Sequence, residues 1–351
     1  MPSGQPLYEE PRDAGAEHRA EQLREVQALI RRERKRAERE RREWFQPDLA
    51  SPARYARSIR KYRRDYLAML GWPLDPTPED VPEAKARVRL VAEDGLGRIY
   101  RVWVRTLPRV STYGLLFLPP GKGPHPLVVS QHGGGGTPEL CSGFFGSANY
   151  NDMTRRVLRR GFAAFAPQLL LWQEQFGPVH NRQQVDVHLK QLGGSITALE
   201  IFRIQRCLDW LAGRRDIDAS RIGMIGLSYG GFYALTTAAA EPRIRATVSS
   251  CFFNDRTVYN HVDWVWKGAA RRFLDPEVAA LICPRPLYIE VGTNDTLFDV
   301  KHAGKQARQV AARYRALGIA DRFRYSEFDG GHELDTADAN IDFLCRHVRD
   351  A

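Results

Sequence analysis

The chain has 351 residues, of which 43% are hydrophobic and 27% are charged, the composition of an ordinary globular protein. No apolar run approaches the roughly 18 residues that span a bilayer, and the first residues lack the pattern of a secretory signal, so no membrane partner is expected. The net charge is +10, and residues 31–64 alone hold 14 Lys+Arg against 5 Asp+Glu, a difference of +9.

The basic stretch allows two interpretations. It forms a solvated helix that docks on the body or on a second subunit, or it contacts nucleic acid or an anionic membrane. Acidic residues are interleaved with the basic ones and no aromatic side chains lie along 31–43, so we expect no nucleic-acid partner. The five cysteines are scattered and show no CxxC spacing, which favours reduced thiols in a cytoplasmic protein.

Residues 1–75 are predicted to form an N-terminal helical arm. Its first helix extends from about 17 to 44, where there is no Pro or Gly, and Leu23, Val26 and Ile30 recur at helical spacing. The second half of this helix has almost no apolar residues, so it is expected to be held by charge pairs and solvent.

A second helix of the arm is predicted to begin at Ser51-Pro52, a cap and a first turn, and to end at Gly71. One face of this helix is apolar and is expected to pack on the main body. That face carries Tyr55, Ile59, Tyr62, Tyr66 and Leu70. A homodimer through the two helices of the arm is a hypothesis.

Residues 76–351 are predicted to form one α/β domain. Three segments from Lys85 onward alternate apolar and polar residues and are divided by turn residues, which indicates antiparallel strands. Strands and helices then alternate, which predicts a doubly wound, mostly parallel sheet of about eight strands. The later strand candidates are residues 126–132, 162–167, 221–228, 245–253, 285–292 and 323–329.

A candidate nucleophile stands where the strand candidate 221–228 runs into Gly226-Leu227-Ser228-Tyr229-Gly230, before a helical pattern. This is GxSxG between a strand and a helix, the context in which a sharp turn exposes a serine hydroxyl. Glycines two positions away on either side leave room for the strained backbone of that turn. Ser228 is therefore the predicted nucleophile.

A serine hydroxyl needs a base, and the last strand candidate ends in Asp329-Gly330-Gly331-His332, so His332 is the predicted base. The imidazole in turn needs a carboxylate. Asp295 is the first choice, because it follows a strand at the carboxyl end, where open α/β sheets bind ligands. Asp299, which is also able to cap the next helix, and Asp255 remain alternatives.

Two backbone N–H groups are predicted to stabilise the developing oxyanion. One belongs to Tyr229, and the other is expected from the loop His132-Gly133-Gly134-Gly135-Gly136, whose glycines leave bare backbone facing a substrate. Gly134 is the first choice there and Gly135 the second. A phosphate loop is the rival interpretation, but no GK[ST] or GxGxxG pattern follows. This chemistry requires no cofactor and no metal.

Together the segments QHGGGG, GLSYGG, IEVGTND and FDGGHE resemble, in order, the four landmarks of the α/β-hydrolase superfamily. The resemblance covers roughly residues 85–350. The stretch LGGSITALEIFRIQRCLDWLAGRRDIDASRIGMIGLSYGG is most similar to the branch of dienelactone hydrolases and acetyl xylan esterase-like proteins. The resemblance implies an α/β-hydrolase fold and a metal-free serine or cysteine hydrolase of carboxylic esters, and the serine found here favours the esterase side.

Two insertions, near 168–193 and 254–284, leave the carboxyl ends of strands and are expected to cover the site as lids. The mixed aromatic and polar character of the first favours a small, polar acyl or sugar ester over a long lipid chain. The alternative is that the tryptophans only pack the insertions onto the body. The expected pocket residues are Trp172, Gln175, Phe252 and Trp264.

The leading prediction is a serine hydrolase that cleaves carboxylic esters through an acyl-enzyme intermediate. Cleavage of peptides or amides by the same three side chains is the second hypothesis. A catalytically silent interaction protein, whose basic arm binds a partner, is the third.

Overall fold

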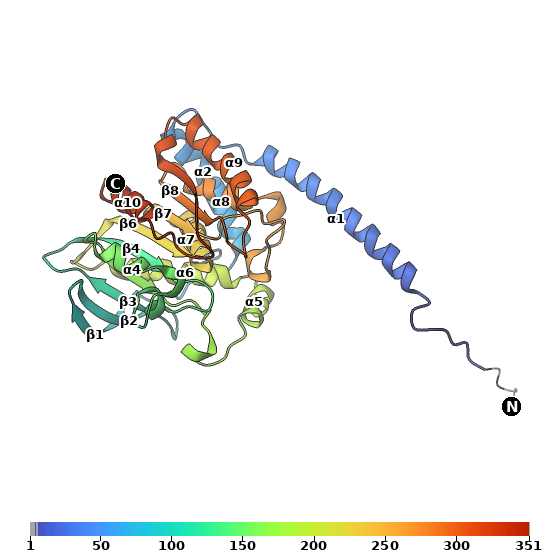
Figure 1. Cartoon of the computed structure of the whole chain (residues 1–351), viewed down its shortest axis with the longest axis horizontal. Coiled ribbons are helices and arrows are strands. Elements are labelled where there is room, and N and C mark those ends of the chain that lie inside the picture. Colours follow the sequence, from blue (N-terminus) through green and yellow to red (C-terminus); the bar gives the residue numbers. More distant parts are fainter. Residues whose placement is uncertain (1–3, 5, 351) are drawn as a thin grey trace. The chain divides into compact units, whose positions relative to one another are not determined.

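A nine-stranded sheet organises the larger part of the chain in the computed structural model, which describes residue 4 and residues 6–350 (Figure 1). Its order is β1-β2-β3-β5-β4-β6-β7-β8-β9. The strands from β1 to β3 and on to β5 pair antiparallel, and the neighbours from β5 to β9 pair parallel. The predicted mostly parallel α/β sheet is confirmed. The strands are β1 (Ala86–Asp94), β2 (Gly97–Leu107), β3 (Val110–Leu118), β4 (His125–Gln131), β5 (Ala163–Pro167), β6 (Ile217–Leu227), β7 (Ile244–Ser250), β8 (Leu287–Gly292) and β9 (Phe323–Phe328).

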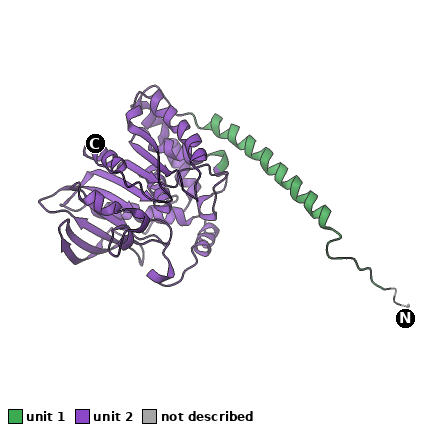
Figure 2. Ribbon diagram, viewed as in Figure 1, with its two compact units in different colours: residues 1–46, 270–272 green, residues 47–269, 273–351 purple. Residues whose placement is uncertain are grey.

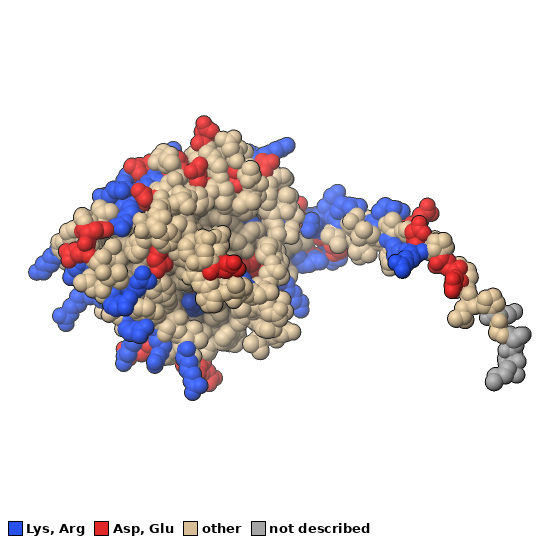
Figure 3. Space-filling model, turned by 60° about the horizontal axis from the view of Figure 1, so that its bottom comes forward, with Lys and Arg blue, Asp and Glu red and all other residues tan. Residues whose placement is uncertain are grey.

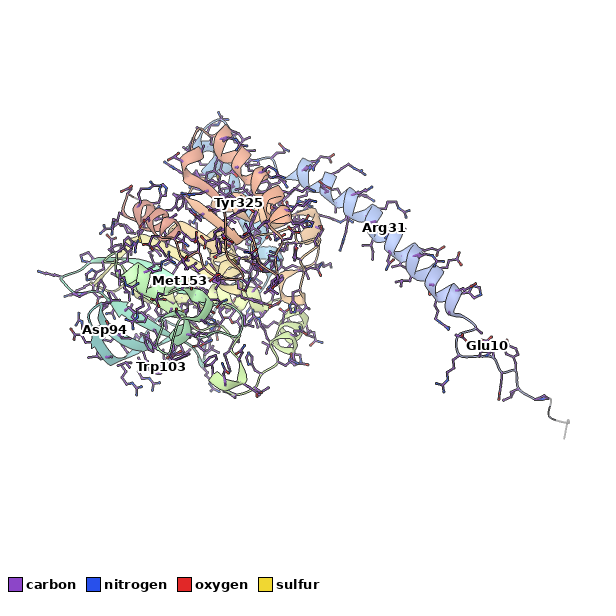
Figure 4. All side chains as sticks on the ribbon, in the orientation of Figure 1. Glu10, Arg31, Asp94, Trp103, Met153 and Tyr325 are labelled. Carbon is purple, nitrogen blue, oxygen red and sulfur yellow. The ribbon has the colours of Figure 1, made fainter. Side chains whose placement is uncertain are left out.

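Helices cover both faces of the sheet, which is why the carboxyl-terminal parts of its central strands are buried. On one face α4 and α10 pack over β4 to β8, and Met153 lies in the apolar core that they form with the sheet (Figure 4). On the other face lie α6 and α7, with α8 beside α7 and α9 against β8 and β9. The helices are α1 (Ala16–Trp44), α2 (Pro52–Leu70), α3 (Pro138–Cys141), α4 (Met153–Leu158), α5 (Arg182–Gln191), α6 (Ile196–Ala212), α7 (Tyr229–Ala240), α8 (Asp275–Ile282), α9 (Val300–Ala316) and α10 (Ala339–Arg349).

The chain divides into two compact units (Figure 2). Unit 1 consists of residues 1–46 and 270–272, and unit 2 consists of residues 47–269 and 273–351. The division therefore falls after Gln46, whereas the sequence prediction placed the end of the arm at residue 75. The physical reason is helix α2, which packs on α6, α7 and α8 as part of unit 2.

Helix α2 has the boundaries and the buried face that the sequence predicts. The Ser51 side chain caps its first turn by accepting the backbone N–H of Arg54, and Gly71 ends it with a φ of 83°. Its apolar face is buried, and within it the Tyr55 hydroxyl donates to the carbonyl of Ala280 in α8. The guanidinium of Arg63 donates to the carbonyls of Ala239 and Leu281 near the ends of α7 and α8.

Helix α1 contrasts with α2 because it is exposed along most of its length within unit 1. Ala37 is its buried residue in the part of the chain that the structure describes. Nearby, Arg271 forms ion pairs with Glu40 at 2.6 Å and with Glu33 at 3.3 Å. Lys and Arg dominate the C-terminal part of this helix (Figure 3).

Two further expectations concern the whole chain. The five cysteines are free thiols and all are buried, as expected. Across residue 4 and residues 6–350, no helix combines the length and the apolar character that crossing a membrane requires.

Candidate active site

Ser228 lies at a sharp turn between β6 and α7, with φ 59° and ψ −123°, a strained conformation for a residue with a side chain. The turn brings backbone segments very close together. A Cβ at Gly226 would lie 2.2 Å from the carbonyl oxygen of Gly230, and a Cβ at Gly230 would lie 2.1 Å from that of Gln131. Both positions therefore require glycine, as the sequence pattern predicts.

The glycine-rich loop after β4 lies against this turn. A Cβ at Gly133 would lie 3.2 Å from the Cβ of Ser228, and a Cβ at Gly134 would lie 3.3 Å from Cδ2 of Tyr229. Gly135 has a φ of +70° and so depends on its lack of a side chain. The predicted oxyanion residues Tyr229 and Gly134 are thus neighbours in space, beside the predicted nucleophile.

A buried histidine holds the base of the glycine loop. The Nε2 atom of His132 accepts the backbone N–H of Leu169 at 3.0 Å, so its Nδ1 carries the proton and donates to the carbonyl of Gly133 at 2.9 Å. Burial lowers the pKa of His132 to about 4, which keeps the ring neutral near pH 7. Its two bonds join the glycine loop to the segment that follows β5.

His332 and Asp295 form a direct pair, with 2.9 Å between Nδ1 of the histidine and Oδ2 of the aspartate. The other carboxylate oxygen, Oδ1, accepts the backbone N–H groups of Leu297 and Phe298. Burial alone would raise the pKa of Asp295, but the hydrogen bond from His332 and these two N–H groups outweigh it and lower that pKa. The ionised carboxylate holds the proton on Nδ1, which leaves Nε2 as the acceptor atom of the ring.

The two alternative carboxylates have other partners. Asp299 is the N-cap of α9 and accepts the backbone N–H of Lys301 at 2.7 Å, the role that the sequence offered as its alternative. Asp255 accepts both the backbone N–H and the hydroxyl of Thr257. Of the three candidates, Asp295 is the one whose carboxylate accepts from His332.

The loop that carries His332 is held by residues that the sequence analysis did not single out. Asn149 donates its side-chain amide to the carbonyl of His332 at 2.9 Å. Asn151 donates to the carbonyl of Leu334 at 2.6 Å and to the carboxylate of Glu333 at 3.0 Å. These asparagines lie about 180 residues earlier in the chain than their partners, and no sequence pattern marks them.

The same segment is strained. Ala148, Asn151 and Asp152 have φ values of 45°, 48° and 58°, in the left-handed region that residues with side chains rarely adopt. Such strain persists only where surrounding contacts determine the backbone, and here those contacts include the loop that carries His332. Segment 148–152 therefore positions the predicted base.

Two cavities lie on the side of the glycine loop. One of about 430 Å³ is lined by Gly134, Gly135 and Asn149, together with Gln175 from the first insertion. The other, of about 620 Å³, is lined by Trp172 and again by Gln175. The structure thus places two of the predicted pocket residues on cavities, and one cavity contains a predicted oxyanion residue.

The other two predicted pocket residues, Phe252 and Trp264, lie in an aromatic cluster. Their ring centroids are 5.1 Å apart, and Trp264 is also 5.1 Å from the ring of Tyr229. Phe298 joins the cluster at 5.7 Å from Phe252 and lies 5.8 Å from the ring of His332. These rings pack around the predicted catalytic residues. This arrangement fits the alternative stated in the sequence analysis, in which the tryptophan packs its insertion onto the body.

A buried ion pair ties the two insertions together. Arg182 in α5 donates to Asp263 at 2.8 Å, and Asp263 also accepts the hydroxyl of Tyr229 at 3.1 Å. The same arginine donates to the hydroxyl of Tyr233 at 2.6 Å. Because both tyrosines belong to the first turns of α7, the insertions are joined to the helix that follows Ser228.

One group of potential metal ligands lies in this region. Ligand atoms of Cys251, Asp295 and His332 all lie within 4.8 Å of one another. The thiol of Cys251 donates to the carbonyl of Glu333 at 3.2 Å, and burial raises its pKa to about 12. Each of the three groups therefore has a protein partner, and a metal ion would have to take Nδ1 of His332 away from Asp295.

A family model and a curated relative match this chain. A sequence model of the dienelactone hydrolase family matches residues 139–320, which are 182 of the 351 residues. YtaP of Bacillus subtilis (strain 168), which is named as a hydrolase, is 28% identical over 235 residues. The match covers 62% of this chain and 76% of YtaP.

Solved structures show the same fold. A protein of Bacteroides fragilis NCTC 9343 that is assigned as an acetyl xylan esterase superposes with a TM-score of 0.64 and 16% identity, over 87% of this chain and 86% of its own. A glucuronoyl esterase of Solibacter usitatus superposes with a TM-score of 0.60 and 16% identity, over 87% of this chain and 97% of its own. The fold is therefore that of the α/β-hydrolases, as the resemblance implied.

Proposed function

The chain belongs to the dienelactone hydrolase family, and on this premise we propose that it cleaves carboxylic esters through an acyl-enzyme formed on Ser228. Ester hydrolysis follows from the family, since a dienelactone is itself a cyclic ester. The catalytic residues and the covalent intermediate are the proposal. The observation that carries it is the His332–Asp295 pair at the carboxyl ends of the parallel strands, where the turn at Ser228 also lies.

In the first step, Nε2 of His332 takes the proton of the Ser228 hydroxyl while its Oγ attacks the ester carbonyl carbon. Asp295 stays ionised, keeps the proton on Nδ1 and stabilises the imidazolium that forms. The bond to the alcohol oxygen then breaks, and His332 gives its proton to the leaving alcohol. A water molecule repeats the sequence on the acyl-enzyme, releases the acid and returns the proton to Ser228.

The oxyanion of each tetrahedral intermediate is stabilised by the N–H groups of Tyr229 and Gly134. The N–H of Tyr229 is the first of α7, and the first N–H groups of a helix have no acceptor within the helix. Gly134 lies against the ring of Tyr229, and the bonds of His132 hold its loop. Such donors need no reorganisation during the reaction, which is the main source of their effect.

The favoured substrates are esters with a small acyl group or a sugar component. The cavity that contains Gly134 is lined by the amides of Asn149, Gln173 and Gln175 as well as by aromatic rings. Amides recognise hydroxyl and carbonyl groups by hydrogen bonds, which a long lipid chain lacks. The names of the superposed structures, an acetyl xylan esterase and a glucuronoyl esterase, both refer to esters with a sugar component.

The nucleophile is tested with 4-nitrophenyl esters of increasing acyl length and a fluorophosphonate probe. Ser228→Ala is expected to lose both the labelling and at least about 10⁴-fold in kcat/KM, the range found when a catalytic triad loses its nucleophile. Ser142→Ala, which changes a buried serine elsewhere, serves as the control. Hydrolysis at the wild-type rate by Ser228→Ala would reject the proposed intermediate.

The same three side chains also suit amide cleavage, so matched ester and anilide substrates with one acyl group are compared. A rate for the anilide that approaches that of the ester would make the chain a peptidase or amidase. A chain that hydrolyses neither substrate and leaves the probe unreacted would be the silent interaction protein.

A further inference from the structure

The cavity of about 620 Å³ lies next to the cavity that contains Gly134 and has no role in the steps above. The two cavities share the lining residues Phe145, Gln175 and Phe176. The rings of Phe145 and Phe176 stack with centroids 5.7 Å apart. This aromatic pair therefore forms the boundary between the cavity that contains Gly134 and the second cavity.

Trp172 is a fixed wall of the second cavity. Its backbone forms a β-bridge with Gly135, the neighbour of the proposed oxyanion donor, so its distance from that donor is set by backbone pairing. Its indole Nε1 donates to the carbonyl of Pro178 at 3.0 Å, and its ring stacks on His180 with centroids 4.2 Å apart. The ring is thus held in one orientation before any ligand arrives.

Another part of the lining is polar, and its charges are paired. Arg101 forms an ion pair with Glu139 at 3.1 Å. Arg203, which is buried, pairs with Glu200 at 2.9 Å. These pairs offer N–H donors and carboxylate acceptors without an excess of one charge. A neutral ligand with hydroxyl groups meets such a lining better than an anion, which needs an unpaired cation.

We propose that this cavity binds a neutral glycosyl residue of an O-acylated saccharide whose ester lies in the cavity that contains Gly134. A pyranose presents a flat face of C–H groups, which packs on an aromatic ring such as Trp172, and an edge of hydroxyls, which suits amides and ion pairs. The volume falls in the range of small-molecule sites. The assignment deepens the proposed function and rests on it for the ester.

Binding is tested first, in the absence of turnover. The full-length Ser228→Ala variant is titrated with cellobiose, a neutral disaccharide, in a calorimeter, and binding is also measured by saturation-transfer NMR. We expect binding, and at least a tenfold weaker affinity when Trp172→Ala is added. Trp103→Ala is the matched control, because Trp103 also lines a cavity beside arginines but lies on the antiparallel strand β2 (Figure 4). No binding, or an equal loss in both variants, would overturn the glycosyl site.

Kinetics of chains that keep Ser228 give an independent readout. Trp172→Ala is expected to lower kcat/KM for mono-O-acetylated cellobiose about tenfold more than for 4-nitrophenyl acetate, mainly through KM. Trp172→Phe, which keeps an aromatic ring, should recover part of that difference. A preference for an O-acetylated uronic acid, whose free carboxylate makes it an anion, over the neutral ester would overturn the assignment to a neutral sugar.

These experiments separate the two proposals. Loss of 4-nitrophenyl acetate hydrolysis in Ser228→Ala supports the ester hydrolase even when cellobiose fails to bind. Cellobiose binding that depends on Trp172 supports the glycosyl site even when Ser228→Ala keeps its activity.

Discussion

Around Ser228 each backbone segment is fixed by contacts with two or more others, whereas helix α1 buries Ala37 and exposes the rest of its side chains in whole or in part. The loops of the site are rich in glycine, histidine and asparagine, which are poor formers of regular structure. Their order comes from close backbone approaches and buried hydrogen bonds. Helix α1 has the opposite character, since local propensity forms it and few tertiary contacts hold it. Substitutions should therefore have large effects in the first region and small effects in the second.

The largest effect on activity is expected for Gly230→Ala, because its Cβ would lie 2.1 Å from the carbonyl oxygen of Gln131. We expect loss of fluorophosphonate labelling and a loss of about 3 kcal/mol in the free energy of unfolding, measured by urea denaturation. Gly95→Ala is the control, since a Cβ there meets nothing within 4 Å. Normal labelling of Gly230→Ala would contradict the packing of the turn.

Arg182→Met should come next, because it leaves the carboxylate of Asp263 buried beside Tyr229 without its cation. Removal of one partner from a buried pair costs about 3–5 kcal/mol, and we expect a lower kcat as well, since Tyr229 carries a proposed oxyanion donor. Arg54→Met is the control, because the Arg54–Asp48 pair lies at the surface, with side chains 58% and 31% exposed, where solvent screens the attraction. Equal losses of unfolding free energy in Arg182→Met and Arg54→Met would show that burial does not determine how much each ion pair contributes.

A moderate effect is expected for Asn151, whose amide holds the loop of His332. Asn151→Gly keeps the backbone at a φ of 48° and removes the amide, whereas Asn151→Ala also strains the backbone. Both should lower kcat about tenfold with little change in KM, and Asn151→Ala should be about 1 kcal/mol less stable than Asn151→Gly. Wild-type kcat in Asn151→Gly would remove the positioning role of the amide.

A smaller effect, on stability alone, concerns Glu290 in β8. Burial raises the pKa of its carboxyl from 4.5 to about 7. A carboxyl with a raised pKa binds its proton more tightly in the folded chain, so its contribution is complete below about pH 4.5 and is lost as the pH rises through about 7. Glu290→Gln should flatten the fall in unfolding free energy over that window. Glu93→Gln is the control and should keep the wild-type dependence of unfolding free energy on pH. If Glu290→Gln shows a dependence as steep as that of the wild type, Glu290 is not the cause of the fall.

The smallest effect on activity is expected in α1, where Leu23, Val26 and Ile30 form a stripe with exposed fractions of 57%, 47% and 47%. The homodimer through the arm stays a prediction, and the buried face of α2 now limits its contact to α1. The triple change of these residues to Gln should reduce the light-scattering mass from twice 39.9 kDa to that of one chain, with unchanged ester hydrolysis. Arg24→Gln, Ala28→Gln and Arg32→Gln together, on the opposite face, should keep the dimer. A wild-type mass of one chain would end the hypothesis.

Local patterns explain what the sequence predicted well. The close approaches at Gly226 and Gly230 follow from the turn at Ser228 itself, and the capping role of Asp299 follows from its place before α9. The mostly parallel pairing of the sheet followed from the alternation of strands with helices. In these cases the residue is marked by its immediate sequence neighbours, although the close approach at Gly230 is to Gln131.

Contacts between distant segments explain what the sequence left unpredicted. Asn151 and Leu334 are 183 residues apart, and Arg182 and Asp263 are 81 apart, and neither pair belongs to a motif. The sequence shows that α2 has an apolar face but not which helices cover it, so the division after Gln46 is a feature that only the structure supplies. Such partners are chosen by the fold, and a single sequence carries no record of that choice.

The packing of α2 on α6, α7 and α8 has a consequence for how this protein can be shortened or fused to others. A truncation that begins at residue 76 would strip the tyrosines of α2 and the Arg63 bonds from two helix ends, and it should expose an aromatic surface that aggregates. A truncation that begins at Pro47 keeps that layer. The smallest truncated form that keeps the catalytic residues and their packing therefore starts with α2. A natural or engineered rearrangement that separates α2 from the sheet and its helices would have to replace α2 with another covering element.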